Sequence, residues 1–174
     1  YEDDNLSAPR DVTVVAPDSE KSAASHAITL YRPLRVIRVS PHGLENVRCY
    51  MVDGLPVDCT KVGIGHVMEG EVDLVVSGIN RGPNQGQDLT YSGTVSAAFE
   101  AVIWHKPAIA FSLCDHSEDA EYEAAAAVAR QIVQLKLYER LPPLTLLNVN
   151  IPPLPLAEMR GFKITRQGLR QYND

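Results

Sequence analysis

The 174-residue sequence predicts an α/β fold: a Rossmann-like, mostly parallel sheet with helices on both faces. Three observations predict it. Short, continuous apolar runs are typical of buried parallel strands, the segments between them have helical apolar spacing, and the two kinds of segment alternate. Hydrophobic residues make up 45% of the chain, which is enough for one ordered core. We therefore expect residues 1–174 to form a single domain.

The amino-terminal part is expected to start the sheet. Residues 11–18, DVTVVAPD, form a β-branched run that predicts a buried strand ending at Ala16, because Pro17 stops it. Residues 26–39 and 47–54 alternate more between apolar and polar side chains. They predict an extra pair of strands, a small β-hairpin off the main sheet.

Helices and strands alternate after this hairpin. Residues 58–69 begin with an acid suited to a helix N-terminus and carry apolar residues at helical spacing. Residues 71–78 repeat the pattern of a buried strand that ends in turn residues. Residues 92–104 open with cap-type residues and continue with good helix formers, and residues 106–113 predict the next strand.

The carboxyl-terminal part adds the clearest helix and the last strand. Residues 117–141 have acids in the first turn and bases towards the end, and residues 145–152, TLLNVNIP, predict a strand. In a doubly wound sheet, ligands collect beyond the carboxyl ends of the strands. The polar stretches that follow the strands are therefore expected to converge on one edge.

Composition disfavours several classes of protein. The net charge of −6 argues against binding a nucleic-acid polymer by bulk charge. No apolar run approaches the roughly 20 residues of a membrane helix, and the first residues lack a signal-peptide pattern. Cys49, Cys59 and Cys114 form neither a CxxC pair nor a disulfide framework, which favours a cytoplasmic location. No Gly-x-Gly-x-x-Gly follows a strand, which disfavours a dinucleotide-dependent oxidoreductase.

Two oxygen-bearing side chains follow predicted strands. Ser22 lies in the stretch APDSEKSAASH, and Asn80 lies in SGINRGPNQGQD. Hydroxyl and amide oxygens are ligands that a hard cation such as Mg²⁺ or Mn²⁺ accepts beside carboxylates. The alternative is a turn asparagine at Asn80 and a helix cap at Ser22, and spacing alone favours that alternative.

The sequence YSGTVSAAF suggests a phosphate site at a helix start. Ser92, Gly93 and Thr94 would offer free backbone amides, two hydroxyls and the positive end of a helix dipole. Asn84 adds an amide group nearby, in a loop whose glycines permit close backbone approach. The alternative is an ordinary N-cap. From the residues alone, these loops favour an enzyme that handles phosphate.

Several consecutive blocks resemble the SurE family of stationary-phase survival nucleotidases. The blocks are VTVVAPDSEKSAASHAITL, DGLPVDC, DLVVSGINRGPNQGQDLTYSGTVSAAFEA, NVNIP and GFKITRQG, in the family's order and over nearly the whole chain. The resemblance implies a SurE-like core with a metal-dependent phosphatase activity on nucleoside 5′- and 3′-monophosphates. It also implies a homodimer or homotetramer in the cytoplasm.

The resemblance implies roles for particular residues as well. The family's single divalent cation, Mg²⁺ or Mn²⁺, is held by two adjacent aspartates, a serine and an asparagine. The serine falls on Ser22 and the asparagine on Asn80. One of the paired aspartates is expected to act as catalytic base as well as ligand. The phosphate-side loop of the family corresponds to Asn84, Ser92, Gly93 and Thr94.

The sequence departs from the family at both ends. The family opens with a strand ending in Thr-Asn-Asp-Asp-Gly and continues past TRQG into a long arm, and we expect residues 1–174 to lack both. Asp3 and Asp4 match the paired aspartates, but too few residues lie between Asp4 and Val12 for a crossover to a parallel strand. Either the strand is missing from this sequence, or Asp3 and Asp4 belong to a solvated tail. The alternative function is a catalytically inactive, SurE-like nucleotide-binding protein that has lost the aspartates.

Overall fold

The computed structural model describes residues 11–68 and 72–169, so Asp3 and Asp4 lie outside the described residues. The strands are β1 (Thr13–Pro17), β2 (Val36–Val39), β3 (Arg48–Val52), β4 (Val75–Arg81), β5 (Ala108–Leu113) and β6 (Leu147–Ile151). The helices are α1 (Pro56–Val62), which continues as a π-helical turn (Gly63–Val67), α2 (Gly93–Ile103) and α3 (Glu123–Gln134), with 3₁₀ turns at Gly86–Tyr91, Leu137–Arg140 and Leu156–Glu158.

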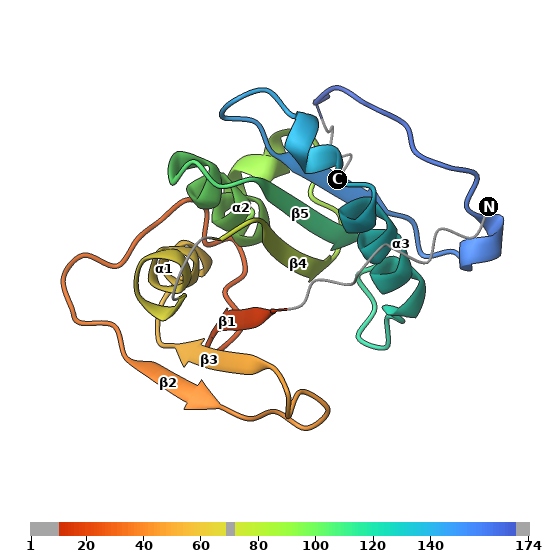
Figure 1. The fold of residues 1–174 in the computed structure, drawn as a ribbon. Coiled ribbons are helices and arrows are strands. Elements are labelled where there is room, and N and C mark those ends of the chain that lie inside the picture. The colour runs from red at the N-terminus through yellow and green to blue at the C-terminus, as the bar shows by residue number, and fades with distance from the viewer. Residues whose placement is uncertain (1–10, 69–71, 170–174) are drawn as a thin grey trace.

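Strands β4, β5 and β6 form a parallel sheet with helices on both faces (Figure 1). All six residues of β5 are buried, as its continuous apolar run predicts. Ile109 and Phe111 pack against α3, whereas Ala108 and Ala110 pack against α2, because successive side chains of a strand point to opposite faces. The predicted α/β architecture is confirmed.

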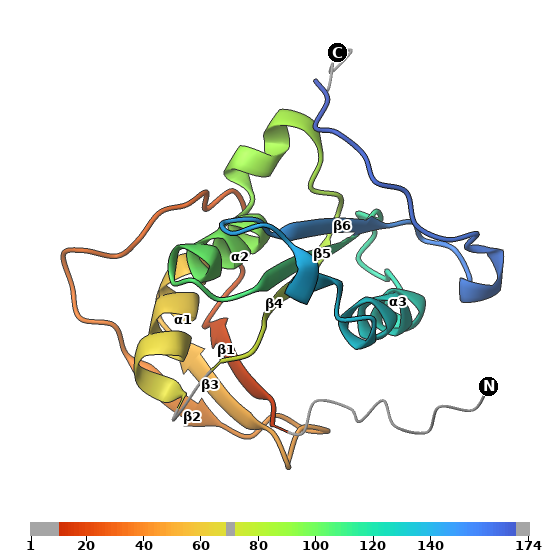
Figure 2. The same ribbon diagram turned by 45° about the horizontal axis from the view of Figure 1, so that its top comes forward.

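Strands β1, β3 and β2 form a second sheet, with α1 packed beside it (Figure 2). The predicted antiparallel pair is present as β2 and β3, but β3 also pairs in parallel with β1. The pair therefore extends the sheet that β1 starts, rather than lying off it. A third cluster of buried side chains, Val52, Cys59 and Val62, joins α1 to this sheet.

The expected single sheet is divided into two within the described residues. There, β1 pairs only with β3 and β4 pairs only with β5, so each sheet has one edge strand towards the other. Strands β1 and β4 lie side by side in both ribbon views (Figures 1 and 2). Each sheet keeps its own core, and the carboxyl ends of the parallel strands supply the loops described below.

Two elements differ in length from the sequence prediction. Helix α3 is shorter than residues 117–141, because Ser117 bonds to Asp115 in a turn before it and Lys136 takes a left-handed conformation (φ 50°) after it. Strand β4 continues past Gly78 to Arg81. Its pairing shifts register between Ser77 and Asn80, which marks a β-bulge.

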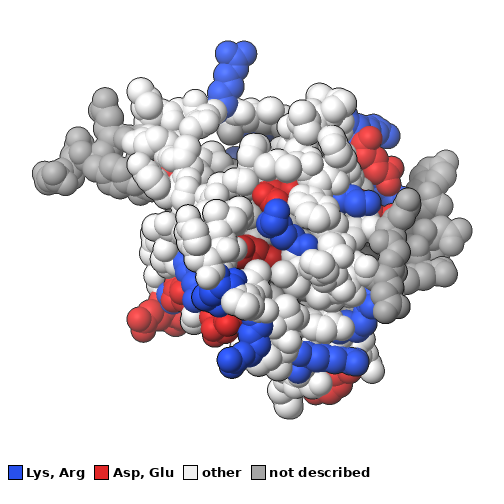
Figure 3. Space-filling view, turned by 90° about the vertical axis from the view of Figure 1, so that its left-hand side faces the viewer, with Lys and Arg blue, Asp and Glu red and all other residues white. Residues whose placement is uncertain are grey.

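The described part of the chain contains no helix long and apolar enough to cross a membrane. On the face that carries α1, lysine and arginine side chains are interspersed with aspartate and glutamate (Figure 3). This face therefore shows no uniform patch of one charge.

Candidate functional site

Polar loops that follow β1 and β4 meet at the start of α2. The backbone amide of Ser25 donates to the carbonyl of Tyr91 (2.9 Å), and its hydroxyl donates to the carbonyl of Thr90 (2.8 Å). Both loops leave the carboxyl ends of parallel strands, where ligands collect in folds of this class. The structure thus brings together two of the stretches that the sequence predicts to converge.

Asn80 lies at the centre of this arrangement. Its side-chain nitrogen donates to the carbonyls of Arg81 and Gly82, at 2.9 Å each. Its side-chain oxygen accepts a hydrogen bond from the hydroxyl of Thr94, at 3.1 Å. These bonds fix the amide group and point its oxygen towards the first turn of α2. Asn80 and Thr94, predicted for the metal and phosphate sites respectively, are therefore direct neighbours.

The first turn of α2 has the geometry of an anion site. Ser92 is the N-cap, and its hydroxyl accepts from the amide of Val95 (3.1 Å), so the ordinary capping role is realised. The amides of Gly93 and Thr94 precede the first position that can bond within the helix, and they remain available to a ligand. A Cβ at Gly93 would lie 2.9 Å from the ring of Pro56, so a glycine lets α1 and α2 approach at this point.

Ser22 lies on the loop after β1 and is exposed. Its hydroxyl donates to Glu20 (3.3 Å), and the same carboxylate oxygen lies 3.6 Å from the guanidinium of Arg81. Arg81 follows Asn80 directly. The Ser22 loop is therefore tied to the strand end that carries Asn80, on the same side of the molecule.

Asn84 is placed differently from the other predicted phosphate ligands. It is buried, and its side-chain nitrogen donates to the hydroxyl of Ser112 (2.7 Å) on β5. Its backbone amide donates to Asn150 (2.8 Å), and its carbonyl accepts from the side chains of Asn148 and Asn150 (3.0 Å each). These bonds hold the loop after β4 onto β5 and β6. A phosphate contact of Asn84 stays a prediction.

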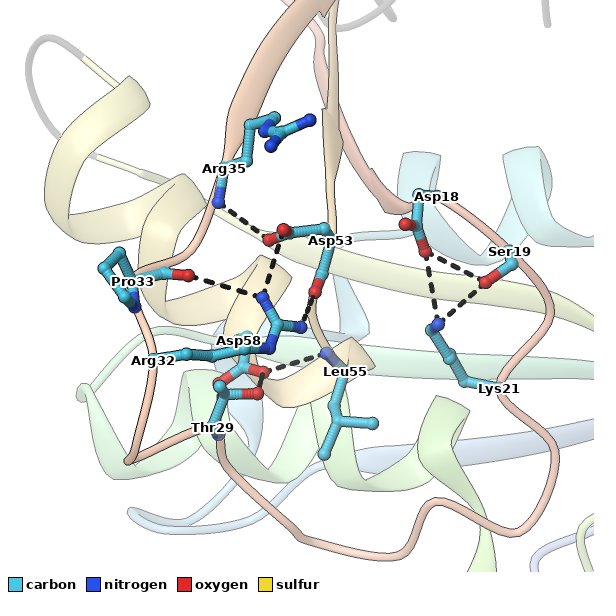
Figure 4. Close-up of polar contacts among 10 residues, drawn as sticks. All are labelled: Asp18, Ser19, Lys21, Thr29, Arg32, Pro33, Arg35, Asp53, Leu55 and Asp58. Atoms are coloured by element: carbon cyan, nitrogen blue, oxygen red, sulfur yellow. Dashed lines mark hydrogen bonds and ion pairs between the residues drawn. The ribbon is translucent and has the colours of Figure 1, made fainter.

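Three carboxylates near the ends of β1 and β3 are already bound to other groups (Figure 4). The hydroxyl of Ser19, and then Lys21, lower the pKa of Asp18 below its usual value. The backbone amide of Arg35 (2.7 Å) is the main group that lowers the pKa of Asp53.

Asp58, the third of these carboxylates, has a structural role. It is buried and accepts hydrogen bonds from the amide and hydroxyl of Thr29 (3.0 and 2.7 Å) and from the amide of Leu55 (2.8 Å). It thereby anchors the start of α1 to the long loop that follows β1.

The donor set fits a hard cation in type but not in charge. Ser22 and Asn80 supply neutral oxygen atoms, which suit Mg²⁺ or Mn²⁺. Residues 11–68 and 72–169 contain no group of three or more histidine, cysteine, aspartate or glutamate side chains that could hold a metal ion. Asp3 and Asp4, the carboxylates that the resemblance implies as the remaining ligands, lie outside these ranges, so their ligand role stays a prediction.

One residue of the site, His116, is absent from the predicted set. It follows β5 by three residues, at the same edge of the sheet. A Cβ on Gly82 would lie 2.5 Å from Cε1 and 2.6 Å from Nδ1 of His116, so the imidazole ring covers this glycine. Its position just beyond a predicted strand end was the signal that could have identified it.

Comparisons with known proteins place these features in one family. The family model described as "Survival protein SurE" matches residues 3–174. A curated relative from Geobacter sulfurreducens named 5′-nucleotidase SurE is 50% identical over 161 residues, covering 92% of this chain and 59% of that protein.

Other relatives and a solved structure agree. The 5′-nucleotidase SurE of Kosmotoga olearia is 43% identical, over 97% of this chain and 66% of that protein. A crystal structure of the SurE protein from Aquifex aeolicus superposes with a TM-score of 0.78 at 42% identity, covering 92% of this chain and 63% of that one. The chain thus spans about three-fifths to two-thirds of the length of these proteins.

Proposed function

The chain belongs to the SurE family, and we propose that the protein hydrolyses nucleoside 5′- and 3′-monophosphates to nucleoside and phosphate with the help of one divalent cation. The contact between Asn80 and Thr94 carries this proposal. It joins an oxygen donor suited to a cation to the start of a helix suited to a phosphate. The names of the curated relatives, 5′-nucleotidase SurE, support the same activity.

The first turn of α2 binds and orients the phosphate in this proposal. The amides of Gly93 and Thr94 donate to its oxygens, and the positive end of the helix dipole favours its negative charge. The Ser92 hydroxyl accepts a hydrogen bond from the amide of Val95 and so fixes the first turn of the helix. Because these donors are fixed before the substrate arrives, they stabilise charge without reorganisation.

The cation is Mg²⁺ or Mn²⁺, and Ser22, Asn80, Asp3 and Asp4 would hold it. When bound, it neutralises charge on the phosphoryl group and activates water for attack. Thr94 and the carbonyl of Gly82 hold the Asn80 amide in one orientation, so its oxygen faces the phosphate site. One of the two aspartates would accept the proton that the attacking water loses.

If the protein forms a single domain, its two sheets are expected to be joined into one. Strands β1 and β4 each pair on one side only within the described residues. A strand that pairs with both would join the two sheets into one, and the first strand of the SurE family, which ends in the paired aspartates, is the candidate that the resemblance implies. Amide hydrogen exchange, measured on the full-length protein, tests whether the two sheets are joined. Slow exchange along the facing edges of β1 and β4 supports the joined sheet, and fast exchange contradicts it.

The proposed setting of the enzyme is a homodimer or homotetramer in the cytoplasm, acting on a small-molecule substrate rather than a nucleic-acid polymer. All three cysteines, Cys49, Cys59 and Cys114, are free thiols in the structure, which suits a reducing compartment. Gel filtration with light scattering measures the oligomer, and a monomer at micromolar concentration would contradict this part of the proposal.

Phosphate release tests the activity. The protein is incubated with Mn²⁺ and nucleoside monophosphates, with and without EDTA, and phosphate is measured. Asn80→Ala should lower kcat about a hundredfold, comparable to the loss of one fixed polar group at a reacting centre. Gln85→Ala is the control, since Gln85 is exposed and its side chain caps nothing. Absence of phosphate release from every nucleotide and simple ester would refute the proposal.

The inactive alternative makes a different prediction. A nucleotide-binding protein without the metal carboxylates should bind nucleoside monophosphates equally well with and without Mn²⁺, and titration calorimetry measures this. Asp3→Asn and Asp4→Asn separate the alternatives further. Each should abolish turnover if the aspartates are ligands, and neither should change it if they belong to a solvated tail.

A further inference from the structure

We infer that His116 contacts the nucleoside part of the substrate and favours nucleotides over phosphate esters that lack a base, because its imidazole ring lies against Gly82, whose carbonyl holds the Asn80 amide. The inference rests on the proposed function, since it assigns one end of the same substrate. It adds a residue from a third loop, the one after β5, to the loops after β1 and β4.

The backbone places His116 at the correct edge of the sheet. Leu113, the last residue of β5, pairs with Arg81 at the end of β4. The amide of Cys114 donates to the carbonyl of Ile151 (2.8 Å), which fixes the chain just beyond the strand. His116 follows two residues later. Its position therefore depends on the sheet itself and not on a long, free loop.

Contact with Gly82 links the ring to Asn80. The Cε1 and Nδ1 atoms of His116 lie 2.5 and 2.6 Å from the position that a Cβ of Gly82 would take. The carbonyl of Gly82 accepts from the Asn80 side chain (2.9 Å), and the Asn80 oxygen accepts from Thr94 (3.1 Å). Thr94, Asn80, Gly82 and His116 thus form a continuous row of contacts.

The two ends of this row suit the two ends of a nucleoside monophosphate. The phosphate is expected at the Thr94 end, where the first amides of α2 are available. His116 occupies the opposite end of the row, and we place the ribose and base of the nucleotide there. The inference therefore assigns the ring to the nucleoside and not to the phosphate.

The chemistry of the ring suits a nucleoside. His116 is exposed, so its ring can reach a ligand. The neighbouring Asp115 is occupied by the amide and hydroxyl of Ser117 (2.9 and 2.6 Å). A flat, exposed aromatic ring stacks on a nucleobase with little dependence on which base it is.

Kinetics with two classes of ester test the inference. His116→Asn removes the ring, His116→Phe keeps a ring, and His105→Asn is the matched control. His105 precedes β5, at the opposite edge of the sheet, and its left-handed backbone (φ 56°) accepts asparagine. The substrates are adenosine 5′-monophosphate and glycerol 2-phosphate, which lacks a base.

His116→Asn should raise KM for adenosine 5′-monophosphate about five- to fiftyfold, the range expected for one stacking contact. It should leave KM for glycerol 2-phosphate within about twofold, since only the nucleoside contact is lost. His116→Phe should keep most of the affinity for the nucleotide, and His105→Asn should change neither substrate. Equal rises for both esters, or no change for either, would overturn the inference.

A binding measurement makes the test independent of turnover. In proton NMR spectra, the Cε1–H signal of His116 is assigned by its loss in His116→Asn. It should shift on addition of adenosine 5′-monophosphate and stay in place on addition of inorganic phosphate. Shifts of equal size would place the ring at the phosphate and contradict the assignment. If the wild-type protein released no phosphate but this signal responded to nucleotide, the hydrolase proposal would fail while the nucleoside contact stood.

Discussion

Replacing Asn84 by alanine tests whether this residue holds the loop after β4 or binds phosphate directly. Its side-chain nitrogen donates to the hydroxyl of Ser112 at 2.7 Å, and both residues are buried, Ser112 completely. Asn84→Ala removes the donor and leaves the Ser112 hydroxyl without this partner in the core. An unsatisfied buried hydroxyl costs about 1–3 kcal/mol, so the free energy of unfolding should fall by about 2 kcal/mol.

A double-mutant cycle isolates the hydrogen bond from other effects. Ser112→Ala should also destabilise the protein, because it leaves the Asn84 amide unsatisfied. The double variant removes both groups, so its loss should be smaller than the sum of the two single losses by about 1 kcal/mol or more. The backbone bonds of Asn84 to Asn148 and Asn150 remain in all three variants. The cycle therefore reports the side-chain contact alone.

Urea unfolding followed by circular dichroism is the assay. Phosphate release is measured on the same variants without urea. Equal denaturant slopes among the variants make the shifts in midpoint comparable. Gln85→Ala serves as the neighbouring control, since Gln85 is exposed. If Asn84→Ala changed stability by less than about 0.5 kcal/mol while phosphate release collapsed, the structural role would be refuted and the phosphate contact favoured.

Four further predictions concern stability and reactivity. Gly78→Ala should lower Tm by about 10 °C or abolish folding, because Gly78 has φ +108° and a Cβ would collide with the carbonyl of Phe111; an unchanged melting curve contradicts this. Glu100→Ala should lower the unfolding free energy by about 1–3 kcal/mol, since the buried carboxylate contacts the side chains of His26 and Lys61 and accepts a hydrogen bond from the indole of Trp104; urea titration measures the loss. Cys59 should resist alkylation at pH 8 until the protein unfolds, because burial raises its pKa to about 12, and mass spectrometry of labelled protein checks this. Folding lowers the pKa of Asp53, so its carboxylate stabilises the protein at any pH above its pKa in the unfolded chain, and this stabilisation is lost as the pH falls through its pKa in the folded protein. When the pH is lowered below about 4, Asp53→Asn should therefore lose less stability than wild type.

The sequence predicts the main elements because each has a strong local signal. The apolar run of β5 and the capped, alanine-rich start of α2 need no distant contact to be identified. The parallel pairing of β3 with β1 has no such signal, because strand pairing depends on long-range contacts. The ends of α3 are also set by local turns that a helix-forming composition conceals, such as the left-handed residue Lys136.

The candidate site shows the same division. Convergence of the Ser22 and Asn80 loops follows from the rule that the ends of parallel strands share one edge, so it could be predicted. The burial of Asn84 could not, because its partner Ser112 lies 28 positions away and serine has no marked preference for this role. His116 is a single histidine in a polar loop, and only the fold shows that its ring covers Gly82.

The bulge in β4 explains why Asn80 faces α2 at all. Ser77 pairs with Ala110 and Asn80 pairs with Ser112, so three steps along β4 match two steps along β5. Paired side chains on parallel strands point to the same face, and Ala110 points to α2. Without the extra residue, Ile79 would pair with Ser112, and Asn80 would turn to the α3 face, where Ile79 now packs.

Gly78 permits this bulge, because its positive φ and the nearby carbonyl of Phe111 leave no room for a side chain. The bulge therefore brings the Asn80 oxygen to Thr94 and the carbonyl of Gly82 to the Asn80 amide. Without the bulge, the order of the residues in β4 would be the same, but Asn80 would lie on the α3 face of the sheet and not on the α2 face. The cation and phosphate sites proposed at this edge of the sheet therefore depend on the extra residue of the β4 bulge as much as on the side chains themselves.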